Sequence, residues 1–188
     1  MSDFKQTTIY ETVDNVYFYY TMAKTPDYGF NPLRIPVKDL PKAGHRYKVD
    51  VCMSKEAAAK FSAAHPYKKI TKIENDDFLK AYKVTEVPFP TQALQYVLTL
   101  KQKVYTVKGD VMHESLRPTV QMYVNGVQED VTQTVAVGNG SKGVVRYSVW
   151  TRTADSTPTV AFYTILVTDL VPYVEKVSAV RVDQRSFG

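Results

Sequence analysis

The chain has 188 residues, of which 44% are hydrophobic, so it is long and apolar enough to form a globular domain and is not a disordered protein. Lysine and arginine number 24 against 19 acidic residues, and this net charge of +5 is compatible with a nucleic-acid partner. The single cysteine, Cys52, excludes an intramolecular disulfide. With neither a signal-peptide core nor a membrane-spanning apolar run, we expect a protein of the cytoplasm with no membrane partner.

The first predicted strand covers residues 16–22, which are aromatic and β-branched and lead into the turn signal T-P-D-Y-G of residues 25–29. Its alternation places Tyr17 and Tyr19 together on one face. Because both faces carry aromatic rings, one of them should be less buried than the other. Residues 30–44 contain three prolines and are expected to form a long connection.

Residues 46–53 alternate more cleanly and predict a half-buried strand. Tyr47 and the apolar residues at the alternate positions after it would face the core. Arg46 and Lys48 would lie on the opposite face, which is partly basic.

Two helices are predicted between the strands. Ser54 is a good N-cap for residues 55–64, which are strong helix formers and are followed by Pro66. A second, shorter helix is expected to begin near Asn75 or Asp76 and to run through Tyr82. Cys52 lies in an apolar run and is interpreted as a small buried residue.

Strands return after Pro90. Residues 98–107 have period-two character and place Lys101, Lys103 and Tyr105 on one face. Asn125-Gly126 is a strong hairpin signal. Further apolar stretches cover residues 118–124, 131–137, 144–150 and 160–167.

This order of elements predicts a mainly β protein. The first candidate is an OB-fold-like five-stranded barrel with elaborated loops and one or two short helices, and a β-sandwich is the alternative that the pattern leaves open. We expect residues 1–175 to form a single OB-like domain and residues 176–188 to form a flexible C-terminal tail.

The densest group of binding residues lies in V-G-N-G-S-K-G-V-V-R-Y-S-V-W, residues 137–150, where a glycine-rich turn opens into a strand. Binding an unpaired strand requires cations along its phosphates and flat side chains against its bases. Arg146 and Trp150, the only tryptophan, share one face of this strand, and Tyr147 lies on the other. Either Trp150 stacks on DNA beside Arg146, or Trp150 is in the core and Tyr147 faces outward.

Other strands carry similar but weaker groups of cations and rings. Their alternative interpretations are ordinary: charged residues on a solvated strand face, rings packed in the core, and a plain turn at residues 138–141 whose backbone N–H groups could also approach a phosphate. The predicted DNA-binding set is Tyr17, Tyr19, Tyr28, Arg46, Lys48, Lys101, Lys103, Tyr105, Asn139, Lys142, Arg146, Tyr147 and Trp150.

Motifs of enzyme chemistry are absent from the sequence. His45, His65 and His113 are scattered and lack metal-ligand spacing with one another or with Cys52. There is no phosphate-binding G-x-x-x-x-G-K-[ST] motif and no G-x-S-x-G motif. We therefore expect no enzymatic activity, no cofactor and no metal.

The order of these motifs resembles a known family. Residues 137–150, followed by V-A-F-Y-T-I-L-V-T-D-L-V-P-Y at residues 160–173, resemble the C-terminal half of podophage-type single-stranded DNA-binding proteins. Residues 25–29 and 47–60 resemble the N-terminal half. The resemblance implies an OB-fold that binds single-stranded DNA without strong sequence preference during phage DNA replication and recombination, in the cytoplasm of the host cell.

The chain departs from that family at its end. Many members carry a strongly acidic tail that recruits polymerase and helicase, whereas residues 175–188 contain three cations and two acids. Contacts with replication proteins are therefore implied by the resemblance alone, and we expect a monomer or a homodimer. The alternative function is a structural β-sandwich protein of a virion, in its capsid or tail, and a nuclease is a second alternative.

Overall fold

A computed structural model describes residues 7–29, 36, 38, 44–108, 111–153 and 155–173 of the chain. The expected tail at residues 176–188 and most of the expected connection at residues 30–44 lie outside this part. None of the helices in the described ranges has the length and apolar character needed to cross a membrane.

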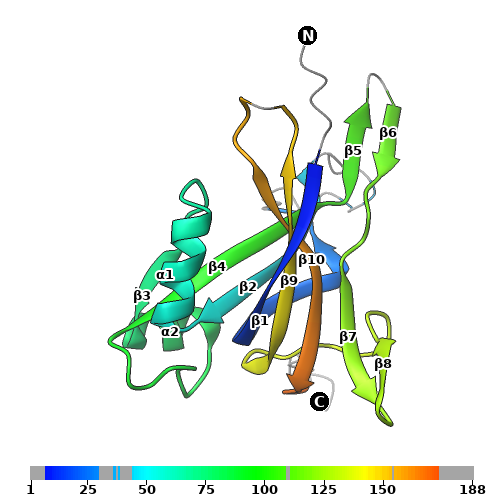
Figure 1. Ribbon diagram of the computed structural model, residues 1–188. Coiled ribbons are helices and arrows are strands. Elements are labelled where there is room, and N and C mark those ends of the chain that lie inside the picture. Colours follow the sequence, from blue (N-terminus) through cyan, green and yellow to red (C-terminus); the bar gives the residue numbers. More distant parts are fainter. Residues whose placement is uncertain are drawn as a thin grey trace, which may run out of the picture.

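The protein is mainly β, as the sequence predicted (Figure 1). Eight strands form one sheet in the order β3-β4-β2-β1-β9-β10-β7-β8, and a separate hairpin pairs β5 with β6. The elements are β1 (Thr7–Asp27), β2 (Arg46–Met53), α1 (Lys55–Ala64), β3 (Thr71–Glu74), α2 (Asn75–Tyr82), β4 (Leu94–Lys103), β5 (Tyr105–Lys108), β6 (Val111–Glu114), β7 (Thr119–Val124), β8 (Val127–Asp130), β9 (Ser141–Thr151) and β10 (Thr159–Asp169).

This sheet differs from the closed five-stranded barrel that we expected. Its five central strands follow one another as β4-β2-β1-β9-β10, and β10 packs back against β4. Within the described residues, however, no hydrogen-bonded ladder joins β10 to β4. Additional strands occupy these two edges instead, since β3 pairs with β4 and β7 pairs in parallel with β10.

The long strand β1 divides the sheet into two walls. Its second half pairs with β2 and its first half pairs with β9, with register irregularities between Val13 and Val16 and between Tyr19 and Met22. Such bulges bend a strand and increase its twist. We call β2, β4 and the second half of β1 the β2–β4 wall, and β9, β10 and the first half of β1 the β9–β10 wall.

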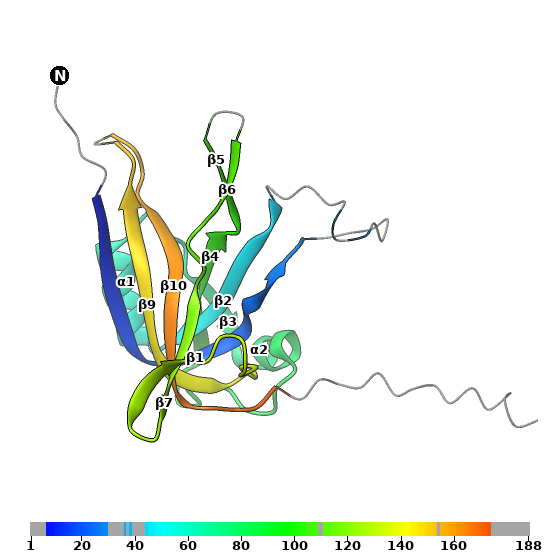
Figure 2. The same ribbon diagram turned by 90° about the vertical axis from the view of Figure 1, so that its right-hand side faces the viewer.

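The two walls enclose one hydrophobic core. Val49 and Leu100 from the β2–β4 wall and Val145 and Ile165 from the β9–β10 wall belong to a single cluster of buried side chains. The inner faces therefore meet, and the solvent faces point away from each other (Figure 2).

Both predicted helices are confirmed. The Ser54 hydroxyl accepts a hydrogen bond from the Ala57 N–H at 3.1 Å and caps α1, and Phe61 is buried in the core. The shorter helix α2 lies on the solvent side of the β2–β4 wall, where Phe78 and Tyr82 pack with Tyr19, Cys52 and Val97 in a second cluster. Cys52 is buried as expected, and burial raises the pKa of its thiol to about 12.

Local turn signals were more reliable than strand boundaries. Asn125 and Gly126 both have positive φ, 51° and 79°, and form the predicted hairpin turn between β7 and β8. The first strand begins nine residues earlier than its predicted start, at Thr7. Residues 131–137 form turns and a single bridge from Val137 to Pro172 instead of a strand.

Candidate nucleic-acid interface

Four of the predicted DNA-binding cations meet on the solvent face of the β2–β4 wall. In the ladder between β2 and β4, Arg46 lies directly opposite Lys103 and Lys48 directly opposite Lys101. The residues between them, such as Val49 and Leu100, are buried in the core. We call this group the basic quartet (Arg46, Lys48, Lys101 and Lys103).

The three lysine charges of the quartet are poorly compensated within the described residues. Like charges directly opposite each other on adjacent strands destabilise a sheet. Among the described residues, none of Lys48, Lys101 and Lys103 has a carboxylate within 4.0 Å. The acid on the same face, Asp50, accepts hydrogen bonds from the Thr99 and Tyr82 hydroxyls, at 2.7 and 2.9 Å.

A fifth cation lies near the quartet. Burial, and then the positive charge of Lys101, lower the pKa of the Lys68 ammonium. Lys68 lies in the segment between α1 and β3. The sequence alone does not indicate this cation, because its neighbour Lys101 is 33 positions away in the chain and approaches it only through tertiary folding.

Two of the predicted tyrosines lie at the end of the β2–β4 wall where β4 runs into β5. A hollow of about 240 Å³ is lined by Tyr28 and Tyr105, and we call it the Tyr28 hollow. The Tyr28 ring meets the His45 ring edge-on, with centroids 4.7 Å apart. Arg117, which the sequence analysis did not select, also lines the hollow, and its guanidinium lies 5.3 Å from the centroid of the Tyr47 ring.

Two predicted contact residues are wrong because they are buried. Tyr19 is 2% exposed, since α2 covers the face that it shares with Tyr17. Tyr147 is 3% exposed, and its hydroxyl donates a hydrogen bond to Glu11 at 2.7 Å. The alternative left open by the sequence is thereby decided: Tyr147 faces the core and Trp150, 37% exposed, faces solvent.

Arg146 and Trp150 lie on the β9–β10 wall, away from the quartet. The Arg146 guanidinium lies 5.3 Å from the ring centroid of Tyr10 and 5.9 Å from that of Tyr163. The two tyrosine rings are 4.6 Å apart. We call Arg146, Tyr10 and Tyr163 the Arg146 cluster, and Trp150 lies four residues further along β9.

Neither tyrosine of this cluster was predicted from the sequence, for identifiable reasons. Tyr10 precedes the predicted start of the first strand, although its alternation with Thr8 and Thr12 was a usable signal. Tyr163 sits at a register shift between Phe162 and Thr164, and a bulge changes which face a side chain occupies.

The glycine-rich turn at residues 138–141 is hydrogen-bonded to three distant parts of the chain. The backbone N–H groups of Gly138 and Gly140 donate to the carbonyls of Val171 and Phe18, at 2.8 and 3.0 Å. The Asn139 side chain accepts from the Tyr20 N–H at 2.7 Å and donates to the Tyr82 carbonyl at 3.0 Å. The interpretation of these residues as a plain turn agrees with these contacts, and the phosphate contact stays a prediction.

Lys142 and Tyr17 form a small pair of their own. They are Cα partners in the β1–β9 ladder, and the Lys142 ammonium lies 5.6 Å from the centroid of the Tyr17 ring. Tyr17 also meets Phe89 edge-on at 5.4 Å, so one side of its ring is covered by protein. In the described part of the chain, no three His, Cys, Asp or Glu side chains are grouped so that they could hold a metal ion.

Known proteins match this chain in their structures but not in their sequences. No protein-family model and no curated protein matches the sequence. A C-terminally truncated single-stranded DNA-binding protein from bacteriophage Enc34 has a TM-score of 0.46 and 12% identity, over 87% of this chain and 88% of the other. The same phage protein in complex with single-stranded DNA gives a TM-score of 0.42 and 11% identity, over 88% and 89%. The single-stranded DNA-binding protein gp2.5 of bacteriophage T7 gives 0.44 and 13%, over 91% of each chain. These three solved structures are all of phage single-stranded DNA-binding proteins.

Proposed function

We propose that the protein binds single-stranded DNA on the β2–β4 wall. One observation carries the proposal: Lys48 faces Lys101 and Arg46 faces Lys103 across adjacent strands, an arrangement that lowers stability unless a polyanion binds to it. The phosphates of a strand would lie along the quartet, and its bases would reach Tyr28 and Tyr105 in the Tyr28 hollow.

These contacts require no particular base. Phosphate contacts carry no sequence information, and every base has a face that can stack on a ring. We therefore propose that the protein coats unpaired strands stoichiometrically, melts hairpins and limits nuclease attack, without catalysis of its own. In this proposal the two walls form one OB-like domain of residues 1–175, and residues 176–188 form its tail.

The biological role is proposed from the resemblance of residues 137–150 and 160–173. It is phage DNA replication and recombination in the cytoplasm of the host cell, with polymerase and helicase as partners and a monomer or homodimer as the working unit.

The Arg146 cluster is proposed as a second contact for longer strands. The rings of Tyr10 and Tyr163 offer stacking surfaces beside a guanidinium, and the exposed Trp150 ring lies further along the same strand. Because this cluster lies on the opposite wall, a short oligonucleotide on the quartet would not reach it. Trp150 fluorescence should therefore be quenched by long oligo-dT and unaffected by short oligo-dT that binds equally well to the quartet.

Fluorescence anisotropy tests the function directly. Labelled oligo-dT should bind more tightly than a duplex of equal length, and log K should fall with log salt at a slope of about −2 to −3.5 if three to five phosphates are neutralised. Equal or tighter binding to the duplex contradicts the proposal. Absence of binding, with assembly into rings or shells, favours the virion protein, and metal-dependent cleavage of the labelled strand favours the nuclease.

A further inference from the structure

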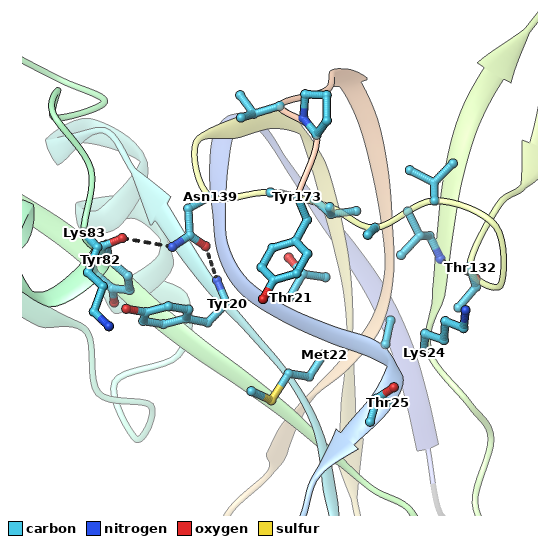
Figure 3. Close-up of a pocket in the computed structure, with 18 of the residues that line it drawn as sticks. Tyr20, Thr21, Met22, Lys24, Thr25, Tyr82, Lys83, Thr132, Asn139 and Tyr173 are labelled. Carbon is cyan, nitrogen blue, oxygen red and sulfur yellow. Dashed lines mark hydrogen bonds between the residues drawn. The ribbon is translucent and has the colours of Figure 1, made fainter. Parts of the chain in front are cut away.

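A groove of about 780 Å³ runs beside the second half of β1 (Figure 3). Its other sides are the C-terminal end of α2, the turn at residues 135–139 and residues 171–173. None of the residues that line it is acidic, and two of them, Lys24 and Lys83, are exposed cations. We call it the β1 groove.

Two tyrosine rings are available in the β1 groove. Tyr20 is 38% exposed and Tyr173 is 60% exposed, and Figure 3 shows the two side chains on neighbouring parts of the groove. Tyr20 has a positive φ of 46°, which is uncommon for an aromatic residue. The Tyr20 N–H donates a hydrogen bond to the Asn139 side chain at 2.7 Å. The Tyr20 hydroxyl donates to the Ala81 carbonyl at 2.5 Å. The Tyr20 ring is therefore fixed in place before any ligand binds.

The strand edge that borders this groove is already capped by side chains. The Asn139 side chain accepts a hydrogen bond from the Tyr20 N–H, and the Arg117 guanidinium donates to the carbonyls of Ala23 and Lys24. A peptide that extended the sheet would need these backbone groups. The remaining chemistry, flat rings beside cations, suits nucleobases and phosphates better than an added peptide strand.

The β1 groove is continuous with the β2–β4 wall. Lys24 and Pro26 line both this groove and the Tyr28 hollow. Met22, which also lines the groove, is the Cα partner of Lys48 of the quartet. A strand that lies along the quartet can therefore enter the groove without leaving the protein surface.

We propose that the β1 groove is a nucleotide subsite that binds a further one or two nucleotides of the same DNA strand. Their bases pack against Tyr20 and Tyr173, and their phosphates lie against Lys24 and Lys83. This inference rests on the proposed single-stranded DNA binding and extends the interface beyond the quartet and the Tyr28 hollow.

Matched tyrosine variants test the subsite. Tyr173→Ala should weaken binding of an oligo-dT of about 16 nucleotides by about tenfold and leave one of about 6 nucleotides unchanged, because only the longer strand fills both regions. Tyr123→Ala is the control, since Tyr123 is 58% exposed on β7 and does not line the groove. Lys83→Gly should also weaken only the longer oligonucleotide, and it is compatible with the left-handed backbone at this position, where φ is 54°.

Photo-crosslinking locates the bases independently. Oligonucleotides that carry 5-iododeoxyuridine should crosslink to Tyr20 or Tyr173, as peptide mapping would show. Suppose that the wild type binds both lengths, that Tyr173→Ala and Lys83→Gly bind each length with wild-type affinity, and that crosslinks form only at Tyr28 or Tyr105. The subsite is then refuted, while the proposed function stands. If the wild type binds neither length, both are refuted.

Discussion

At the scale of single residues, the proposed role of the quartet in binding can be separated from its effect on stability. Lys101→Ala removes one of two like charges that face each other, so the free energy of unfolding should rise by about 0.2–1 kcal/mol. The same change should weaken binding to all single strands alike and reduce the salt slope by about 0.7, because one phosphate contact is lost. Urea unfolding and anisotropy titrations at several salt concentrations measure the two effects.

A surface lysine elsewhere is the control for this prediction. Lys60 is exposed on α1, so Lys60→Ala removes the same charge from the protein without touching the β2–β4 wall. Equal losses of affinity in the two variants would mean that only net charge matters and that the quartet is not a site.

The two aromatic residues near the end of β9 should behave differently when truncated. Trp150 faces solvent, so Trp150→Ala should leave the protein folded and change its stability by no more than about 1 kcal/mol. Tyr147 lies in the core, and Tyr147→Ala should cost about 3–5 kcal/mol through the cavity that it leaves. Thermal unfolding of both variants checks this, and a larger loss for Trp150→Ala would reverse the assignment of the two faces.

Glu11 should make stability depend on acid pH. The Tyr147 hydroxyl, and then the His65 ring, each 2.7 Å from the carboxylate, lower the pKa of Glu11 from its ordinary value of 4.5. Because the folded-state pKa lies below the unfolded one, this carboxylate stabilises the fold above about pH 4.5, and the contribution is lost as the pH falls through the folded-state pKa. Glu11→Gln should therefore lower the free energy of unfolding at neutral pH. In acid, the difference in free energy of unfolding between this variant and the wild type should become smaller. An equal gap at both pH values would argue against this account.

At the scale of elements, the close approach of β9 and β10 requires a glycine. A Cβ added at Gly143 would overlap the carbonyl oxygen of Leu166 and lie 3.1 Å from the ring of Phe18. Gly143→Ala should therefore destabilise the protein by about 2 kcal/mol or more. Gly44→Ala, where the new Cβ meets nothing within 4 Å, should leave the melting temperature nearly unchanged. Similar melting temperatures for the two variants would contradict the packing described for these strands.

Elements with local signals were predictable from the sequence. The N-cap Ser54 and the Asn125-Gly126 turn act through hydrogen bonds or backbone conformations within a few residues, so they can be identified without knowledge of the fold. Strand limits and faces were less predictable because neighbours from distant parts of the chain decide them. Tyr19 is buried by α2, about sixty positions later, and no periodicity in residues 16–22 could indicate that cover.

At the scale of the whole molecule, alternation identified the outward cations but not how they are grouped. It placed Arg46, Lys48, Lys101 and Lys103 on solvent faces correctly. It could not reveal that β2 and β4 are neighbours, because Lys48 and Lys101, which lie opposite each other, are more than fifty residues apart in the sequence. For the same reason it could not show that Arg146 and Trp150 belong to the opposite wall.

Binding of an unpaired DNA strand to the β2–β4 wall can be tested residue by residue. Backbone amide chemical shifts of the ¹⁵N-labelled protein, recorded during titration with short oligo-dT, test it most directly. The account predicts that the largest changes fall on residues 46–48 and 101–105, with the β9–β10 wall little affected. Changes confined to the β9–β10 wall, or no change at saturating oligonucleotide, would contradict it.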